Sequence, residues 1–126
     1  MNLEKVVFGF FIVLAATLNF GFVYGDIGDP HHHHVWEFFA AFVVNVVATV
    51  LKLGDRTQVG AIHLATSLVA VLQLVAAALV WFFAAQAEAG VSPGAMASIV
   101  SLSAGALLAN VVSVVILISE TVVQRR

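Results

Sequence analysis

The sequence predicts an all-α membrane protein whose four transmembrane helices form one domain over residues 1–126. Of its residues, 62% are hydrophobic and 10% are charged, more apolar surface than a soluble domain of this size could bury. A transmembrane helix needs about 20 mostly apolar residues. Four such runs cover roughly residues 5–24, 35–53, 59–87 and 95–119. We therefore expect no soluble catalytic domain and no nucleic-acid binding in this sequence.

The first three runs carry their own boundary signals. The run over 5–24 lacks a basic start and ends in residues 21–24 without the small-residue cleavage site of a signal peptide, so we expect a retained helix. Trp36 and Trp81 lie near the outer ends of the second and third runs, where indole rings favour the membrane interface.

The breaks between the later runs are short. Residues 54–58 and 90–94 are rich in glycine and polar residues, and the second break also contains a proline. Short connections place neighbouring helices antiparallel. The sequence therefore predicts two antiparallel helical hairpins.

The charges predict the orientation. When the chain alternates across the bilayer, every basic residue falls on one side: Lys5, Lys52, Arg56, Arg125 and Arg126. The positive-inside rule makes that side cytoplasmic, so both termini are expected there. The opposite side carries acidic residues and no Lys or Arg: Asp26, Asp29, Glu37 and Glu88. We therefore expect an acidic outer face.

Each predicted helix carries one side-chain amide, and each amide needs a hydrogen-bonding partner in hydrocarbon: Asn19, Asn45, Gln73 and Asn110. On the second helix, Asn45 and Thr49 belong to a polar face that runs from Glu37 to Lys52. Similar faces are expected on the third and fourth helices, the former with His63, Thr66 and Gln73, the latter with Ser103, Asn110 and Ser113. Such residues can simply let helices pack closely. Alternatively, Asn45 and Thr49 line a pore or cavity in an oligomer.

Two absences exclude classes of protein. The chain has no cysteine, which excludes disulfides, iron–sulfur clusters and thiol redox chemistry. No Asp, Glu, Lys or Arg lies near the middle of a predicted span, whereas proton-coupled exporters usually need an ionisable residue at depth. His63 and Glu120 lie near the predicted cytoplasmic boundary, where we expect both side chains to be hydrated.

The loop before the second run is rich in possible ligands. Its carboxylates, Asp26 and Asp29, suit hard cations and would form rings with Glu37 at the mouth of a symmetric oligomer. The imidazoles that follow prefer transition metals: His31, His32, His33 and His34. In the structural alternatives, Asp29 is the N-cap of the second helix and the histidine run is a solvated loop.

Three short stretches resemble known families. The Tyr-Gly-Asp-Ile of residues 24–27 is similar to the end of the potassium-channel signature, Thr-Val-Gly-Tyr-Gly-Asp. Residues 26–30 resemble the Asp-Ile-x-acid-Pro signature of the mitochondrial calcium uniporter, which implies that Asp26 and Asp29 select Ca²⁺. Residues 48–58 resemble an uncharacterised family of small bacterial four-span proteins, which implies a bacterial inner membrane and no known activity.

Three functions remain open. The first is an oligomeric cation channel or permease for a divalent cation, and the second is a non-transporting accessory subunit of a larger membrane complex. The third is a membrane metal sensor or enzyme, which fits least because histidines adjacent in sequence cannot all point to one metal. We therefore expect no enzymatic activity and no cofactor except a bound divalent cation. The expected partners are the lipid bilayer, further copies of the chain and inorganic cations.

Overall fold

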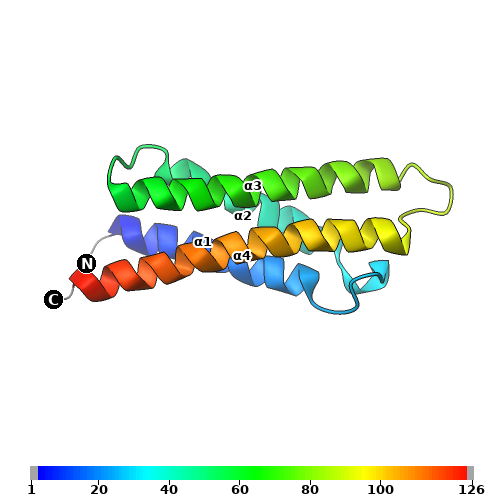
Figure 1. The fold of residues 1–126 in the computed structure, drawn as a ribbon, viewed down its shortest axis with the longest axis horizontal. Coiled ribbons are helices and arrows are strands. Elements are labelled where there is room, and N and C mark those ends of the chain that lie inside the picture. Colours follow the sequence, from blue (N-terminus) through cyan, green and yellow to red (C-terminus); the bar gives the residue numbers. More distant parts are fainter. Residues whose placement is uncertain (1–2, 125–126) are drawn as a thin grey trace.

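The computed structural model describes residues 3–124, and these fold into helices without strands. The elements in chain order are α1 (Leu3–Val23), the short 3-10 helix η1 (Pro30–His32), α2 (Val35–Lys52), α3 (Gln58–Ala84) and α4 (Pro93–Gln124). Each long helix packs against two others in the cyclic order α1, α2, α3, α4, so the chain forms one antiparallel bundle (Figure 1). The predicted all-α class with four long helices is confirmed. Arg125 and Arg126, which contributed to the predicted orientation, lie outside the described residues.

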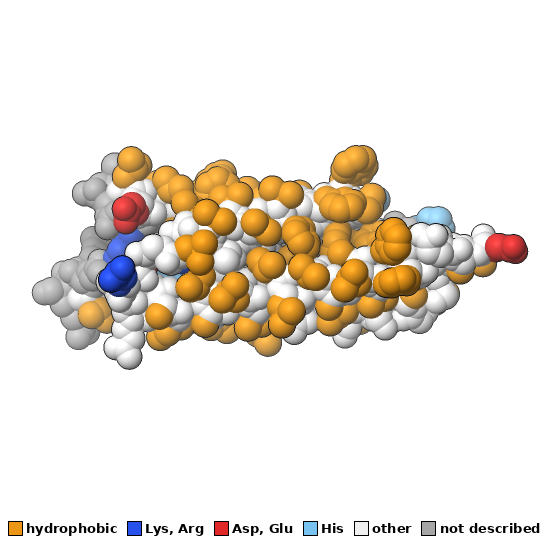
Figure 2. Space-filling model, turned by 90° about the horizontal axis from the view of Figure 1, so that it is seen from above, with side chains coloured by type: hydrophobic (Ala, Val, Ile, Leu, Met, Phe, Trp, Pro, Cys, Tyr) orange, Lys and Arg blue, Asp and Glu red, His pale blue; other side chains and the backbone are white. Residues whose placement is uncertain are grey.

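All four long helices are long and apolar enough to cross a membrane. On the face drawn in Figure 2, hydrophobic side chains cover the sides of the bundle, and charged side chains gather at its two ends. This distribution fits a surface that contacts lipid along its length and water at each end. The protein is therefore a multi-pass membrane protein.

The two ends of the bundle differ in chemistry. We call one end the basic end, because the start of α1 and the α2–α3 connection bring Lys5, Lys52 and Arg56 there. The opposite end contains η1 and the α3–α4 connection (Figure 1), and we call it the histidine end after residues 31–34.

Local hydrogen bonds explain where the helices begin. Thr57 caps α3, because its hydroxyl accepts a hydrogen bond of 3.0 Å from the Gly60 N–H. Pro93 opens α4, where a missing N–H has no cost. Asp29 does act as an N-cap, but of η1 and not of the second long helix as predicted; α2 begins after His34 instead.

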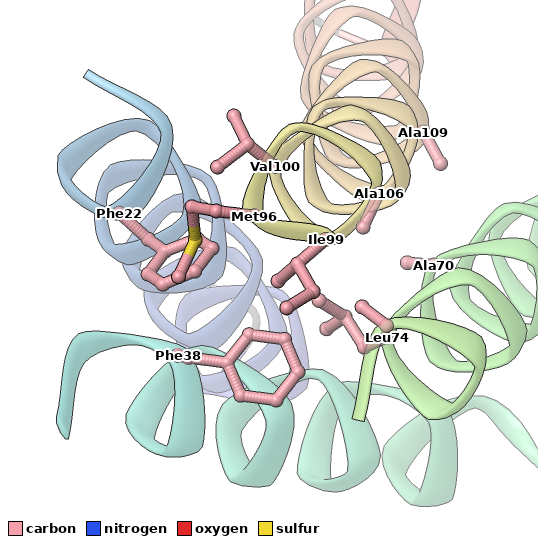
Figure 3. Packing of buried hydrophobic residues seen from close by; sticks show 10 residues of the cluster. Phe22, Phe38, Ala70, Leu74, Met96, Ile99, Val100, Ala106 and Ala109 are labelled. Atoms are coloured by element: carbon pink, nitrogen blue, oxygen red, sulfur yellow. The ribbon is translucent and has the colours of Figure 1, made fainter. Parts of the chain in front are cut away.

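The buried hydrophobic residues form two clusters. Towards the histidine end, Phe22, Phe38, Leu74, Met96 and Ile99 pack together from all four helices (Figure 3). Towards the basic end, a smaller cluster contains Phe8, Ile12 and Ala48. Polar side chains are buried in the bundle along with these clusters.

Candidate functional site

All four long helices direct polar side chains into the bundle. We call this set of eight buried residues the polar interior: Asn19, Asn45, Thr49, His63, Ser67, Ser103, Asn110 and Ser113. They recur at intervals of three or four with alanines such as Ala41, Ala70 and Ala106, and this spacing aligns them on the inward face of each helix. The alanines leave room for the helices to approach closely.

The prediction of which residues of the third helix face inward was partly wrong. Ser67 takes the inward position that we expected for Thr66, whose hydroxyl returns to the His63 carbonyl oxygen at 2.9 Å. Gln73 is only half-buried, and its amide lies over Gly105 of α4. The true inward line steps by both three and four residues, from His63 through Ser67 to Leu74, as a period of 3.6 requires.

His63 is also more deeply placed than its position in the sequence suggested. Its side chain has an exposed fraction of 0%, so the prediction of a hydrated interfacial group is wrong. Its Nδ1 lies 2.6 Å from Ser113 Oγ, which ties α3 to α4. Phe8 of α1 covers the imidazole, with ring centroids 4.9 Å apart. Glu120, in contrast, forms an ion pair of 2.6 Å with Lys5.

The polar interior has few hydrogen bonds of its own. Asn45 Nδ2 donates to the Ala41 carbonyl oxygen at 2.7 Å, and Thr49 Oγ1 donates to the Asn45 carbonyl oxygen at 2.9 Å. Both bonds return to the backbone of the same helix, as short polar side chains often do. They leave much of the hydrogen-bonding capacity of the set unused.

Eight buried side-chain atoms in the described part of the chain have no hydrogen-bond partner. They are Nδ2 and Oδ1 of Asn19, Oδ1 of Asn45, Nε2 of His63, Oγ of Ser67, Oγ of Ser103, and Nδ2 and Oδ1 of Asn110. Leaving a buried polar group unpaired costs about 1–3 kcal/mol. The set offers both donors and acceptors and, apart from His63, only neutral groups. It can therefore hydrogen-bond to a polar or hydrated species in the bundle.

The polar interior extends along the bundle axis. Ser113 and Ser103 mark its extremes on α4, and a rise of about 1.5 Å per residue separates them by about 15 Å. Ser113 is level with His63 near the basic end, and Ser103 lies towards the histidine end. The polar stretch therefore spans about half of a hydrocarbon layer that is ~30 Å thick.

Three aromatic rings pack together towards the histidine end, and we call them the aromatic plug. The ring centroids of Phe22, Phe38 and Trp81 lie 5.3, 5.7 and 5.5 Å apart in pairs. Phe22 and Phe38 are buried and point towards the same space between the helices (Figure 3). Sequence patterns could not indicate this grouping, because the three residues come from three helices.

The basic end opens into a cavity of about 840 Å³ with six charged lining residues: Glu4, Lys5, Lys52, Asp55, Arg56 and Glu120. Lys52 Nζ lies 3.5 Å from Asp55 Oδ2 and 4.2 Å from the centroid of the Phe8 ring. Phe8 also lines the cavity and contacts His63, so it separates the cavity from the polar interior.

Hydrogen bonds at Asp55 organise the rim of this cavity. Its Oδ1 accepts from the Thr57 N–H at 2.9 Å and from the Thr57 hydroxyl at 2.7 Å. These two bonds, together with the nearby Lys52 ammonium, lower the pKa of Asp55 below its ordinary value of 3.8. The carboxylate therefore stays charged and fixes the turn before α3.

The predicted pore-lining residues face the inside of one chain. Asn45 and Thr49 have exposed fractions of 0% and 9%, because this face of α2 packs against α1 and α3. A pore between subunits would need them on the outside of the bundle. Any path that Asn45 and Thr49 line would therefore run within a single bundle.

The predicted acidic mouth does not form a cluster within one chain. Asp26 Oδ1 accepts from the Gly28 N–H at 3.1 Å, and Asp29 Oδ1 accepts from the His31 N–H at 2.9 Å, so both carboxylates stabilise turns of their own loop. The Glu37 carboxylate instead lies against Gly21 of α1.

The four loop histidines do not converge on a metal site. Among residues 3–124, no group of three or more His, Asp or Glu side chains could hold a metal ion. His31 and His34 are exposed, whereas His33 is buried with both ring nitrogens beside backbone carbonyl oxygens. The predicted metal cluster of His31, His32, His33 and His34 is therefore not supported.

Comparison with known proteins identifies a family. A family model described as a family of unknown function (DUF6394) matches residues 32–121. Because this segment covers more than half of the chain, the protein belongs to that family. The segment includes α2, α3 and most of α4, and with them Asn45, His63 and Asn110. No curated protein and no solved structure matches the chain.

Proposed function

We propose that this member of the DUF6394 family is a membrane transport protein that passes a small cation through the polar interior of a single bundle. The observation that carries the proposal is the set of eight unpartnered buried atoms on residues such as Asn19, Asn45 and Asn110. Apolar side chains of similar size would pack there without that cost. Buried polar groups that lack partners call for a role beyond stability, and transport supplies one.

The chemistry of the interior favours a cation with a small dehydration cost. Amide and hydroxyl oxygens can replace part of a hydration shell, yet bind weakly enough to release the ion again. Divalent cations prefer carboxylates, and the described interior residues include none. A proton or monovalent cation therefore fits this path better than the divalent cation predicted from Asp26 and Asp29.

The two ends of the bundle suggest where the path is gated. The aromatic plug blocks the histidine end, and Phe8 lies between the basic-end cavity and His63. Transport therefore requires movement at both positions. The positive-inside rule places the basic end in the cytoplasm, and the resemblance of residues 48–58 to a bacterial family suggests an inner membrane.

If the path lies within one bundle, an oligomer is not needed to form it. Two or more copies would place independent paths side by side, and no symmetric ring of Asp26, Asp29 and Glu37 would be needed. Passing an ion involves no bond-making step, so the proposal includes neither an enzymatic activity nor a cofactor.

The proposal is tested by flux into liposomes that contain the purified protein. H⁺, Na⁺, K⁺ and Ca²⁺ are compared for the wild type and for the double variant Asn45→Leu with Asn110→Leu. The variant keeps the number and branching of the side-chain heavy atoms but removes four polar atoms, so we expect flux to fall about tenfold or more, a barrier increase of at least ~1.4 kcal/mol.

The matched control is Val46→Leu with Val111→Leu, at the neighbouring exposed positions. We expect it to retain wild-type flux. No flux of any cation through folded wild-type protein would contradict the proposal and favour an accessory subunit. Equal flux in the interior and control variants would contradict the path.

A further inference from the structure

Two consecutive histidines clasp the loop between α1 and α2. His33 Nδ1 lies 2.5 Å from the carbonyl oxygen of Phe22, and His33 Nε2 lies 2.7 Å from the carbonyl oxygen of Asp26. His32 Nδ1 accepts a hydrogen bond of 2.8 Å from the Asp26 N–H. The N–H and the carbonyl group of Asp26 are therefore held by two neighbouring imidazoles. We call this arrangement the histidine clasp.

The two contacts of His33 require a particular protonation state. A carbonyl oxygen can only accept, and a neutral imidazole has one N–H donor and one bare nitrogen. Only the doubly protonated ring donates to both carbonyl oxygens. In the neutral ring, one nitrogen lone pair faces a carbonyl oxygen inside a site where the side chain is 3% exposed. The closed clasp therefore favours His33 with both nitrogens protonated.

His32 requires the opposite state. Its Nδ1 is an acceptor, so the ring proton lies on Nε2, which faces Asp29 Oδ2 at 3.4 Å. A second proton on His32 would place two N–H groups against each other at Asp26. The closed clasp therefore favours a neutral His32 beside a charged His33.

The other charged groups near the clasp are already engaged in the loop or lie on neighbouring elements. Asp26 Oδ1 and Asp29 Oδ1 accept from backbone N–H groups, and Glu37 of α2 lies against α1. From the other two helices, Trp81 of α3 contacts the Phe22 ring, and Pro93 of α4 lies beside Gly28. The hydrogen bonds of the clasp itself are made by the ring nitrogens of His32 and His33.

The clasp is joined to the aromatic plug through Phe22. His33 holds the carbonyl oxygen of Phe22 near the end of α1, and the two rings lie 5.6 Å apart. The Phe22 ring also contacts Phe38 and Trp81. Release of the clasp therefore frees the end of the helix that carries one ring of the plug.

We propose that the histidine clasp is a pH-operated latch: the loop is held while His33 is doubly protonated and His32 is neutral, and it opens when either histidine leaves that state. Opening loosens the aromatic plug at the histidine end. The clasp is inferred from its hydrogen-bond geometry alone, whereas its effect on transport rests on the proposed function. We expect the loop to be most ordered at an intermediate pH and more mobile on either side of it.

The test combines two readings on the full chain in lipid nanodiscs. Nitrogen NMR of ¹⁵N-labelled imidazoles reports which ring nitrogens are protonated. A nitroxide on Ile27→Cys, an exposed loop position in a chain without cysteine, reports loop motion. We expect the loop to be least mobile where His33 shows two protonated nitrogens and His32 shows one. An immobile loop around a neutral His33 would overturn the proposal.

Variants separate the two sides of the pH profile. His33→Gln should leave the loop mobile throughout, while His32→Asn, whose amide oxygen can replace Nδ1, should stay clasped at the acidic side. His34→Gln, at an exposed ring, should behave as the wild type. A wild-type profile in His33→Gln would overturn the latch.

Flux in the same variants tests the link to the plug. We expect flux to rise under conditions that mobilise the loop. If the loop opens with pH but the flux does not change, the link between clasp and plug is overturned. If the loop opens with pH and no flux is seen at all, the latch is supported and the proposed function is contradicted.

Discussion

His63 of α3 and Ser113 of α4 are hydrogen-bonded inside the bundle, with Nδ1 and Oγ 2.6 Å apart and both side chains at 0% exposure. This pair fixes the register of two helices near the basic end. It also leaves His63 Nε2 as the unpartnered atom of the imidazole. Nδ1 of His63 therefore holds α3 against α4, while Nε2 remains available for a further hydrogen bond.

Ser113→Ala removes the partner of His63 Nδ1 and should destabilise the bundle by about 1–3 kcal/mol, the cost of an unpaired buried polar group. Thermal unfolding in detergent, followed by circular dichroism, measures the change. Ser101→Ala, at an exposed position of the same helix, is the control and should unfold as the wild type. Equal unfolding of both variants would show that the bond contributes nothing.

Gly60→Ala should destabilise the start of α3. A methyl group at Gly60 would overlap the Asp55 carboxylate, which holds Thr57 in its capping position. Overpacking of this kind costs roughly 1–3 kcal/mol. Gly54→Ala is the matched control, because nothing lies within 4 Å of a methyl group there. Unfolding temperatures that fall equally in both variants would contradict this assignment.

Asp55 should make the protein sensitive to acid. The hydrogen bonds from Thr57 and the nearby Lys52 lower its pKa in the folded state, so the charged carboxylate contributes stability above the ordinary value of 3.8. That contribution is lost as the pH falls from this value through the folded pKa. Asp55→Asn should flatten this acidic limb in unfolding measured against pH. Glu88→Gln, at an exposed position, should keep it.

Gly25→Ala should disturb the histidine clasp more than Gly90→Ala disturbs its own loop. Both glycines have positive φ angles, 109° and 78°, which cost other residues about 1–2 kcal/mol. Only Gly25 also meets a neighbour, since a methyl group there would lie 2.9 Å from His32 Cβ. Loop mobility by spin label separates the two effects. Similar mobility in both variants would mean that the contact with His32 does not hold the loop.

Much of the fold follows from sequence, because apolar runs and glycine-rich breaks determine how many helices cross a membrane. The inward faces of α2 and α4 also follow, since Asn45 and Ser103 lie on regular small-residue stripes. The closure of the bundle does not, because the contact of α1 with α4 joins distant parts of the chain.

The loop was the least predictable part. His33 was expected to act with its neighbours in metal binding, yet its partners are backbone carbonyl oxygens of Phe22 and Asp26. Backbone groups carry no side-chain signal, so sequence patterns cannot indicate such contacts. The burial of His63 was missed for a related reason, because position along a helix indicates depth but not which face is enclosed.

Passage of ions through the inside of one bundle can be tested at two neighbouring positions of α4. Since the chain has no cysteine, Asn110→Cys in the interior and Val111→Cys on the exposed face can be compared directly. The measurement is cation flux before and after a positively charged, membrane-impermeant thiol reagent. We expect labelling and block at position 110 and unchanged flux at position 111. Flux that continues through protein whose position 110 stays unlabelled would contradict it.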